Sequence, residues 1–114
     1  MSVQSIAACL LLLVCGLTVA QAQNLADGPQ LAKDNICMGC HQVDRTRVGP
    51  PFVAVAARYG KGGEQMVDYL ANSIQKGGRG RWGAVPMPAQ PQVTEEEARG
   101  LAVWILSLSK AEKP

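Results

Sequence analysis

Apolar residues recur at the three-to-four-residue spacing of an amphipathic helix in four stretches of this chain, and no stretch alternates apolar and polar residues as a half-buried strand does. The first predicted helix opens with Asp27 as its cap and Pro29 in its first turn, and it runs up to Cys37. The second and third are predicted over Phe52–Tyr59 and Glu64–Lys76. The pattern predicts an all-α fold of four helices, two of them short.

The fourth predicted helix has the clearest start signal in the chain. Thr94 followed three residues later by Glu97 forms a capping box, and the acidic residues 95–97 favour the positive end of the helix dipole. Its buried face is predicted to comprise Ala98, Leu101, Ala102, Ile105 and Leu108, with Trp104 at the edge or inside. The core should therefore form where this face meets the other helices.

Apolar stripes on the middle helices complete the expected core. They comprise Phe52, Val55, Ala56 and Tyr59 on the second helix and Met66, Val67, Leu70 and Ile74 on the third. Two segments are predicted to be loops. Residues 42–51 close with Gly49-Pro50-Pro51, and residues 77–91 are rich in glycine and proline and contain Pro86-Met87-Pro88.

Residues 1–22 have the pattern of a secretory signal peptide. They carry no charged side chain, include the apolar run Ile6 to Val14, and end in Ala20-Gln21-Ala22, a small-x-small cleavage signal. An uncleaved membrane anchor is the alternative, because the first five residues lack the usual Lys or Arg. Cleavage after Ala22 leaves residues 23–114 as one domain.

The mature chain has few means of filling its interior. Loss of the signal peptide removes Cys9 and Cys15, and a bridge between the remaining Cys37 and Cys40 would close too short a loop to add much stability. Five aromatic residues remain: Phe52, Tyr59, Tyr69, Trp82 and Trp104. A large apolar cofactor at the centre of the fold would supply the missing core.

Charge gives no sign of nucleic-acid binding. The formal net charge is +2, and the basic residues are not gathered into one stripe. They fall after the cysteines (Arg45, Arg47) and in the glycine-rich loop (Lys76, Arg79, Arg81), whereas glutamates cluster at 95–97. This dipolar pattern is typical either of a solvated surface or of one that steers an acidic partner.

Cys37-Met38-Gly39-Cys40-His41 carries the chemistry. Two thiols separated by two residues, with histidine directly after, is the arrangement for covalent attachment of c-type haem. The thiols add across the two vinyl groups of the porphyrin, and the imidazole of His41, the only histidine, ligates the iron. A redox dithiol would need a βαβ context, and a zinc site would need a fourth ligand; the sequence offers neither a strand pattern nor a second Cys or His pair.

Met87 is the candidate for the sixth coordination position of the iron. Met38 lies within the attachment motif, and Met66 falls on the apolar stripe of a helix. Met87 stands between two prolines in a loop, and such a stiff backbone suits a thioether held against a metal. Iron ligated by His and Met has a raised potential and no vacant site, so it favours electron transfer over ligand chemistry.

These residues resemble a bacterial class I cytochrome c, closest to the small cytochrome c551 (c8) type. The resemblance rests on Cys37 to His41, Val48-Gly49-Pro50 with Phe52, the stretch from Arg81 to Pro88, and Ala102-Val103-Trp104 in the final helix. It covers essentially the whole mature chain. It implies a compact helical fold around one covalent haem, working as a soluble periplasmic electron shuttle.

The resemblance also implies roles for individual residues. Cys37 and Cys40 would form the thioethers, His41 and Met87 would be the axial ligands, the Pro50 carbonyl would accept the ring N–H of His41, and the Trp82 indole would bond a haem propionate. Two positions depart from the family. An arginine that pairs with a propionate is replaced by Ser73, leaving Lys76, Arg79 or Arg81 as substitutes, and Gln90 stands near where an asparagine commonly bonds the methionine sulfur.

The function expected is therefore a one-electron carrier in a respiratory chain, without enzymatic activity. Expected donors are a dehydrogenase or a bc1-type complex, and expected acceptors an oxidase or a reductase, with the protein itself a monomer that binds no nucleic acid and has no membrane span once mature. One alternative is a haem enzyme or gas sensor with a vacant distal site, although the only histidine is already used. Another is an electron-accepting subunit bound permanently to one dehydrogenase.

Overall fold

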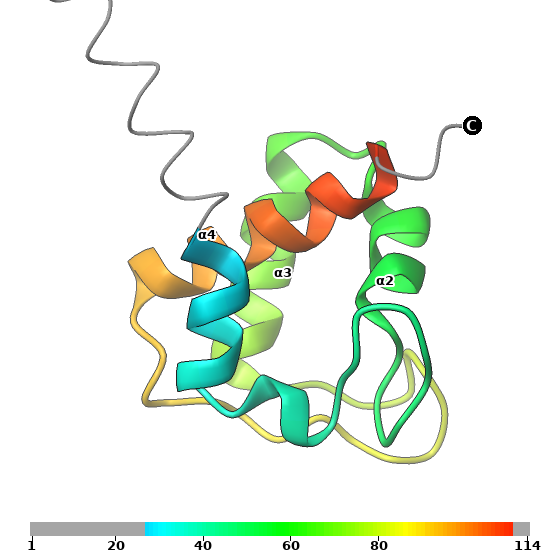
Figure 1. The fold of residues 1–114 in the computed structure, drawn as a ribbon. Helices are drawn as coiled ribbons and strands as arrows, with labels where there is room; N and C mark the ends of the chain where they lie inside the picture. The colour runs from blue at the N-terminus through cyan, green and yellow to red at the C-terminus, as the bar shows by residue number, and fades with distance from the viewer. Residues whose placement is uncertain (1–26, 111–114) are drawn as a thin grey trace, which may run out of the picture.

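The computed structural model describes residues 27–110, which are helical and contain no strand (Figure 1). A helix over residues 27–34 is followed by η1 (Cys37–Gly39), α2 (Phe52–Tyr59), α3 (Glu64–Lys76), α4 (Glu95–Ser107) and η2 (Leu108–Lys110). The predicted bounds of the second and third helices are confirmed. The signal peptide predicted over residues 1–22 lies outside the described residues, and no helix within 27–110 is long and apolar enough to cross a membrane.

Helix α4 is the centre of the packing. It contacts both α2 and α3, and Figure 1 shows it running across the upper part of the molecule past α3. Its start is the predicted capping box: Thr94 Oγ1 accepts from the Glu97 N–H at 3.1 Å, and Glu97 Oε2 accepts from the Thr94 N–H at 2.9 Å. Four of the five residues predicted for its buried face are buried, and Trp104 lies inside, whereas Leu108 is only partly buried because it belongs to η2.

The first helix approaches α4 closely at one point. A Cβ atom at Gly28 would overlap the Trp104 side chain, so only glycine allows the helix backbone to reach that ring. The Trp104 ring in turn meets Phe52 edge-on, with 5.4 Å between the ring centroids. The first helix, α2 and α4 are thereby joined through aromatic packing.

The predicted stripe on α3 is wrong at one residue. Val67, Leu70 and Ile74 are buried as expected, but Met66 is partly exposed in the first turn, where it lies beside Gly62, and Ala71 is buried instead. The buried positions 67, 70, 71 and 74 share one face of the helix, and Met66 lies at the edge of that face. Met66 is therefore not a core residue.

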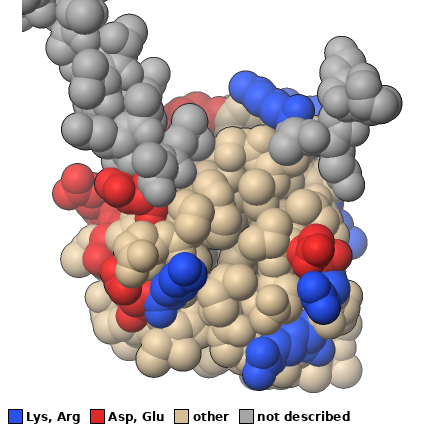
Figure 2. Space-filling model, viewed as in Figure 1, with Lys and Arg blue, Asp and Glu red and all other residues tan. Residues whose placement is uncertain are grey.

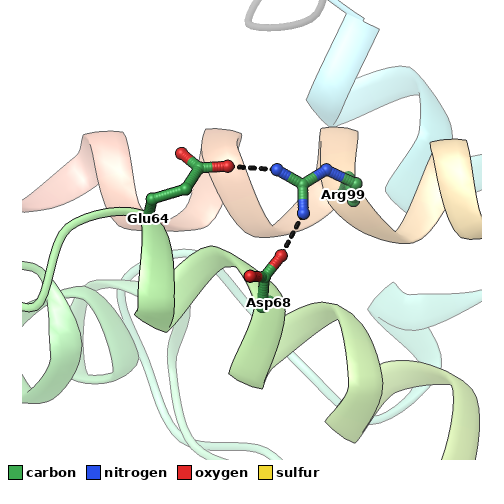
Figure 3. A network of polar contacts seen from close by, with 3 residues as sticks. All are labelled: Glu64, Asp68 and Arg99. Carbon is green, nitrogen blue, oxygen red and sulfur yellow. Dashed lines mark hydrogen bonds and ion pairs between the residues drawn. The ribbon is translucent and has the colours of Figure 1, made fainter.

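An exposed ion-pair network also joins α3 to α4 (Figure 3). The Arg99 guanidinium of α4 forms hydrogen bonds with Glu64 and Asp68, one turn apart on α3. These hydrogen bonds raise the pKa of Arg99, so the guanidinium keeps its charge up to and beyond the ordinary pKa of arginine. The side chains are 39%, 72% and 64% exposed in the order Arg99, Glu64, Asp68, so salt screens the network and its contribution to stability is small.

The first helix ends earlier than predicted. Residues 27–34 are helical, the Asn35 side chain donates to the Leu31 carbonyl at 3.1 Å, and Ile36 adopts a left-handed backbone with φ of 59°. Hydrogen bonding of Asn35 to the backbone of the preceding turn satisfies a terminal carbonyl and favours the end of the helix. The cysteine motif consequently starts a separate turn, η1, in a new direction.

Ile36 is strained, and its replacement by glycine is expected to stabilise the protein. It is the only non-glycine residue within 27–110 with a positive φ, and its side chain is 78% exposed, so packing offsets little of the strain. A left-handed backbone costs a non-glycine residue about 1–2 kcal/mol, and glycine gives back about 0.5–1 kcal/mol through its freer unfolded chain. We expect a net gain of up to about 1 kcal/mol for Ile36→Gly in chemical denaturation of the haem-loaded protein.

Ile36→Ala is the matched control for that measurement. It removes the exposed apolar side chain and keeps the Cβ atom that makes the left-handed backbone unfavourable. We expect it to change the free energy of unfolding by less than half as much as Ile36→Gly. Equal gains for the two variants would attribute the effect to loss of the exposed side chain and contradict the strain.

Candidate functional site

A large cleft lies between α2, α3 and the two long loops, which run side by side at one end of the molecule in Figure 1. The space inside the cleft, counted together with its open mouth, is ≈ 960 Å³. Its walls are mostly apolar and include Phe52, Val55, Leu70, Ile74 and Ile105. A smaller hollow lined by Cys37, Cys40, His41 and Met87 adjoins it.

All six residues predicted for the site line these two hollows. Cys40, His41, Pro50, Trp82 and Met87 border the large cleft, and Cys37 borders the smaller one. Their side chains come from three parts of the chain: η1 and the two residues after it, the loop 42–51, and the loop 77–91. The fold therefore brings together residues that are up to 50 positions apart in sequence (87 − 37 = 50).

A tight turn sets the spacing of the two thiols. The Cys40 and His41 N–H groups both donate to the Cys37 carbonyl, at 3.2 and 2.9 Å. The two thiols are not joined by a disulfide; Cys40 is exposed, and Cys37 is partly buried. Burial raises the pKa of the Cys37 thiol above its ordinary value, with a backbone hydrogen bond opposing, so this thiol is protonated at neutral pH. Both sulfurs are available for thioether bonds.

The His41 ring is held in one orientation. Its Nδ1–H donates to the Pro50 carbonyl at 2.8 Å, so in the neutral imidazole Nε2 is the nitrogen without a proton, and the ring stacks on Phe52 with 5.0 Å between centroids and an angle of 17°. Gly49 allows this approach, because a Cβ there would lie 2.6 Å from His41 Cε1. The imidazole thus presents a free nitrogen lone pair, the form in which histidine ligates a metal.

Met87 is fixed by its backbone. Its N–H donates to the Gly78 carbonyl at 2.9 Å and its carbonyl accepts from the Gly78 N–H at 3.0 Å, an isolated antiparallel bridge that the sequence did not predict. The preceding Gly77 has a φ of 73°, and a Cβ there would lie 2.5 Å from the Met87 carbonyl. The side chain is partly buried and packs against the core. Both sides of the Pro86-Met87-Pro88 segment are therefore restrained.

Gln90 does not contact the Met87 sulfur. Its side-chain amide donates to the Pro88 carbonyl at 3.1 Å, and its Oε1 accepts from Gln92 at 2.8 Å. Its backbone N–H bonds the end of α3 at the Ile74 carbonyl. Gln90 thus does not donate to the Met87 sulfur; it holds the loop against the end of α3.

Arg58 is a site residue that sequence reasoning missed. Its guanidinium lies 3.7 Å from the centroid of the Trp82 ring, and its Nη1 donates to the Arg81 carbonyl at 2.8 Å. The Arg58 guanidinium covers one face of the Trp82 ring through this cation–π contact, and Trp82 as a whole is 38% exposed. The basic residue in the last turn of α2 gave no local signal of a partner 23 positions away.

The residues present fit a covalently attached haem. Two unbridged thiols one turn apart, an imidazole with a free Nε2, a restrained thioether and a large apolar cleft are the groups that such a cofactor requires. The rival zinc site lacks ligands, because no three His, Cys, Asp or Glu residues within 27–110 lie close enough to hold a metal ion.

Comparisons with a family profile, with known sequences and with solved structures all match cytochromes c. The family profile described as cytochrome c matches residues 25–109. The chain is 53% identical over 79 residues to cytochrome c-552 of Hydrogenobacter thermophilus, covering 69% of this chain and 79% of that protein. It is 47% identical over 98 residues to cytochrome c-551 of Stutzerimonas stutzeri, covering 85% and 92%. The crystal structure of wild-type Nitrosomonas europaea cytochrome c552 is similar with a TM-score of 0.68 at 42% identity, covering 71% of this chain and 99% of that one.

Proposed function

Because the chain belongs to the cytochrome c family, we propose that it is a periplasmic one-electron carrier whose single haem is ligated by His41 and Met87. Haem c is attached through Cys37 and Cys40. When bound, its iron supplies the reversible exchange of one electron. The observation that carries the proposal is the pairing of an oriented imidazole with a restrained thioether on one apolar cleft.

His41 and Pro50 act as a unit in this proposal. The Pro50 carbonyl accepts the Nδ1–H of His41 and so keeps Nε2 as the donor atom. This hydrogen bond also adds electron density to the imidazole, which favours the oxidised iron, and the stacked Phe52 ring keeps water from that side. Contacts among residues of this chain thus orient the imidazole in the proximal half of the site.

Met87 closes the sixth position. A thioether is a soft, weakly basic donor, so it favours the reduced iron and raises the potential. Because the Gly78 bridge and the flanking prolines restrain its backbone, the side chain opposes displacement by water, oxygen or peroxide. This argues for a carrier and against an enzyme or gas sensor.

Trp82 supports the carboxylate edge of the haem. Its indole is a donor only, and it borders the cleft mouth with Arg58 stacked on its ring. A propionate at this edge is the acceptor that the indole N–H requires. The family resemblance implies the same hydrogen bond for Trp82.

The proposed location and partners rest on the predicted signal peptide and on the distribution of charge over the surface. The predicted signal peptide over residues 1–22 accounts for export to the periplasm, where haem c proteins of this size carry electrons as monomers between a dehydrogenase or bc1-type donor and an oxidase or reductase. In the face drawn in Figure 2, most Asp and Glu lie along the left edge and several Lys and Arg at the lower right, with single basic groups also at the top and left of centre. This separation of charge suits brief docking with an acidic partner surface.

The test is a visible absorption spectrum of protein exported by a host that matures c-type cytochromes. We expect low-spin spectra in both oxidation states, with the weak far-red sulfur-to-iron band in the oxidised form. A high-spin spectrum that shifts with carbon monoxide would contradict the electron carrier and indicate a ligand-binding protein. Gel filtration with its native neighbours at low and high salt separates a free carrier from a fixed subunit, since only brief docking is lost as salt screens charge.

A further inference from the structure

The charges that line the cleft have one sign. Arg79 and Arg81, both on the loop 77–91, are the charged residues that border it, and no carboxylate does. Arg58 adds a third guanidinium nearby through its bond to the Arg81 carbonyl. Within residues 27–110, none of these three arginines forms an ion pair. Positive groups without counter-ions at the mouth of an apolar cleft indicate that the bound group brings the negative charge.

Haem supplies two carboxylates on the edge of the ring away from its vinyl groups. With Cys37 and Cys40 holding the vinyl-derived edge, the carboxylates would lie toward the part of the cleft farther from η1. The loop residues 79–82 border that cleft together with Tyr59 and Tyr69. The position of this loop is therefore suited to meet the carboxylates, and the remaining question is which cation does so.

Arg81 is the cation that the fold holds in place. Its Nη1 donates to Ser73 Oγ at 2.8 Å, and its Cζ lies 5.0 Å from the centroid of the Tyr69 ring. The Ser73 hydroxyl donates to the Tyr69 carbonyl at 2.8 Å, so its lone pairs are what face Arg81. This arrangement uses one of the five N–H donors of the guanidinium and leaves the others for an anion.

The backbone of Arg81 is held as well. Arg58 bonds the Arg81 carbonyl and stacks on Trp82, which ties this part of the loop to α2, while the Ser73 contact ties it to α3. Arg79 and Arg81 are both exposed, but within the described part of the chain Arg79 makes no hydrogen bond or cation–π contact. A cation ordered before binding loses less entropy when it meets an anion.

We propose that Arg81, positioned by Ser73 and Tyr69, is the main counter-charge to a haem carboxylate in this protein. The proposal rests on the haem carrier proposed above and adds a residue to it. It assigns the role left open by Ser73 to a side chain on a different element. Arg58 is a positioning residue for the same loop.

The groups that face Arg81 set the expected response to pH. They are Tyr69 on α3, Tyr59 and Arg58 on α2, and Arg79 on its own loop. Burial raises the pKa of Tyr69 above its ordinary value, with Tyr59 adding to the shift and Arg81 and Arg58 opposing it, so this phenol stays neutral near pH 7. A change in charge at this edge near neutral pH therefore comes from the carboxylate.

The experiment is a titration of the midpoint potential against pH for the haem-loaded protein. Ionisation of a carboxylate near the iron stabilises the oxidised state, so the potential falls as pH rises through its pKa. Because Arg81 stabilises the ionised carboxylate and so lowers its pKa, the fall in midpoint potential occurs at low pH. We expect Arg81→Gln to move the falling part of the curve upward by about one pH unit, and Arg81→Lys to move it by less than half as much.

Arg79→Gln and Ser73→Ala are the matched controls. Arg79→Gln removes a charge from the same loop and is expected to move the curve by less than a third of the Arg81→Gln shift. Ser73→Ala is expected to shift it in the same direction as Arg81→Gln, with no added shift in the double variant, because the two residues act through one contact. Coincident curves for Arg81→Gln and the parent, or a larger shift for Arg79→Gln, would overturn the proposal.

Failure of the carrier function itself gives a different result. Arg81→Gln leaves His41 and Met87 untouched, so its low-spin spectrum and far-red band should match those of the parent. A parent protein that lacked these features would contradict the axial ligands, whereas the shift between parent and Arg81→Gln tests the carboxylate contact alone.

Discussion

Replacement of Cys37 and Cys40 by alanine is expected to leave a chain that neither keeps haem nor folds fully. The cleft between α2 and α3 is bordered by core residues, among them Phe52, Leu70 and Ile105. Covalent attachment keeps haem at a high effective concentration beside these walls, and without it, occupancy depends on the free haem available. A core this small supplies only about 3–5 kcal/mol without such a staple.

We expect the double variant to lose haem on a denaturing gel and at least about 3 kcal/mol of stability, with a smaller helical signal in circular dichroism at 25 °C. Gly39→Ala is the control, since it alters the motif between the thiols and its Cβ would meet nothing closer than 3.6 Å. That variant should keep haem and stability. Haem retained through denaturation in the double variant would show that the attachment lies elsewhere.

Met87→Ala should open the iron to outside ligands while the fold is kept. The Gly78 bridge uses only the Met87 backbone, so the loop should keep its course when the thioether is removed. The expected changes are a high-spin oxidised spectrum, loss of the far-red band, binding of cyanide or carbon monoxide, and a potential lowered by a substantial part of the about 0.8 V that axial ligands span.

Met66→Ala is the matched control for Met87→Ala. Met66 is also a partly exposed thioether, but it lies in the first turn of α3 and does not border the cleft. We expect its spectrum, potential and cyanide resistance to equal those of the parent. A Met87→Ala variant that kept its potential and excluded cyanide would assign the sixth ligand to another group.

The sequence alone predicted the features that depend on neighbours along the chain. The bounds of α2 and α3 follow from apolar spacing ended by glycine and proline, and the capping box of α4 follows from Thr94 and Glu97. The haem attachment motif is equally local, because its chemistry needs two thiols and an imidazole within five residues. Such signals can be read without knowing what the chain packs against.

Where the prediction missed, a distant or competing contact was responsible. The first helix ends at residue 34 because the Asn35 side chain bonds the Leu31 carbonyl and Ile36 adopts a left-handed backbone, although both positions fit the helical spacing. Met66 fits the helical spacing of α3 but lies at the edge of its buried face, whose members are Val67, Leu70, Ala71 and Ile74. Gln90 was a possible donor to the Met87 sulfur. Instead its backbone N–H bonds the end of α3, and its side-chain amide donates to the Pro88 carbonyl.

Sequence by itself determined the helical class, the attachment motif and the candidate ligands, since these depend on residue type and local spacing. Tertiary structure decided how the rest of the site is supported: Gly78 beside Met87, Arg58 over Trp82 and Arg81 against Ser73. These contacts join residues 8–24 positions apart through loops (81 − 73 = 8; 82 − 58 = 24). Periodicity carries no information at such separations, so only packing of the whole chain could select those partners.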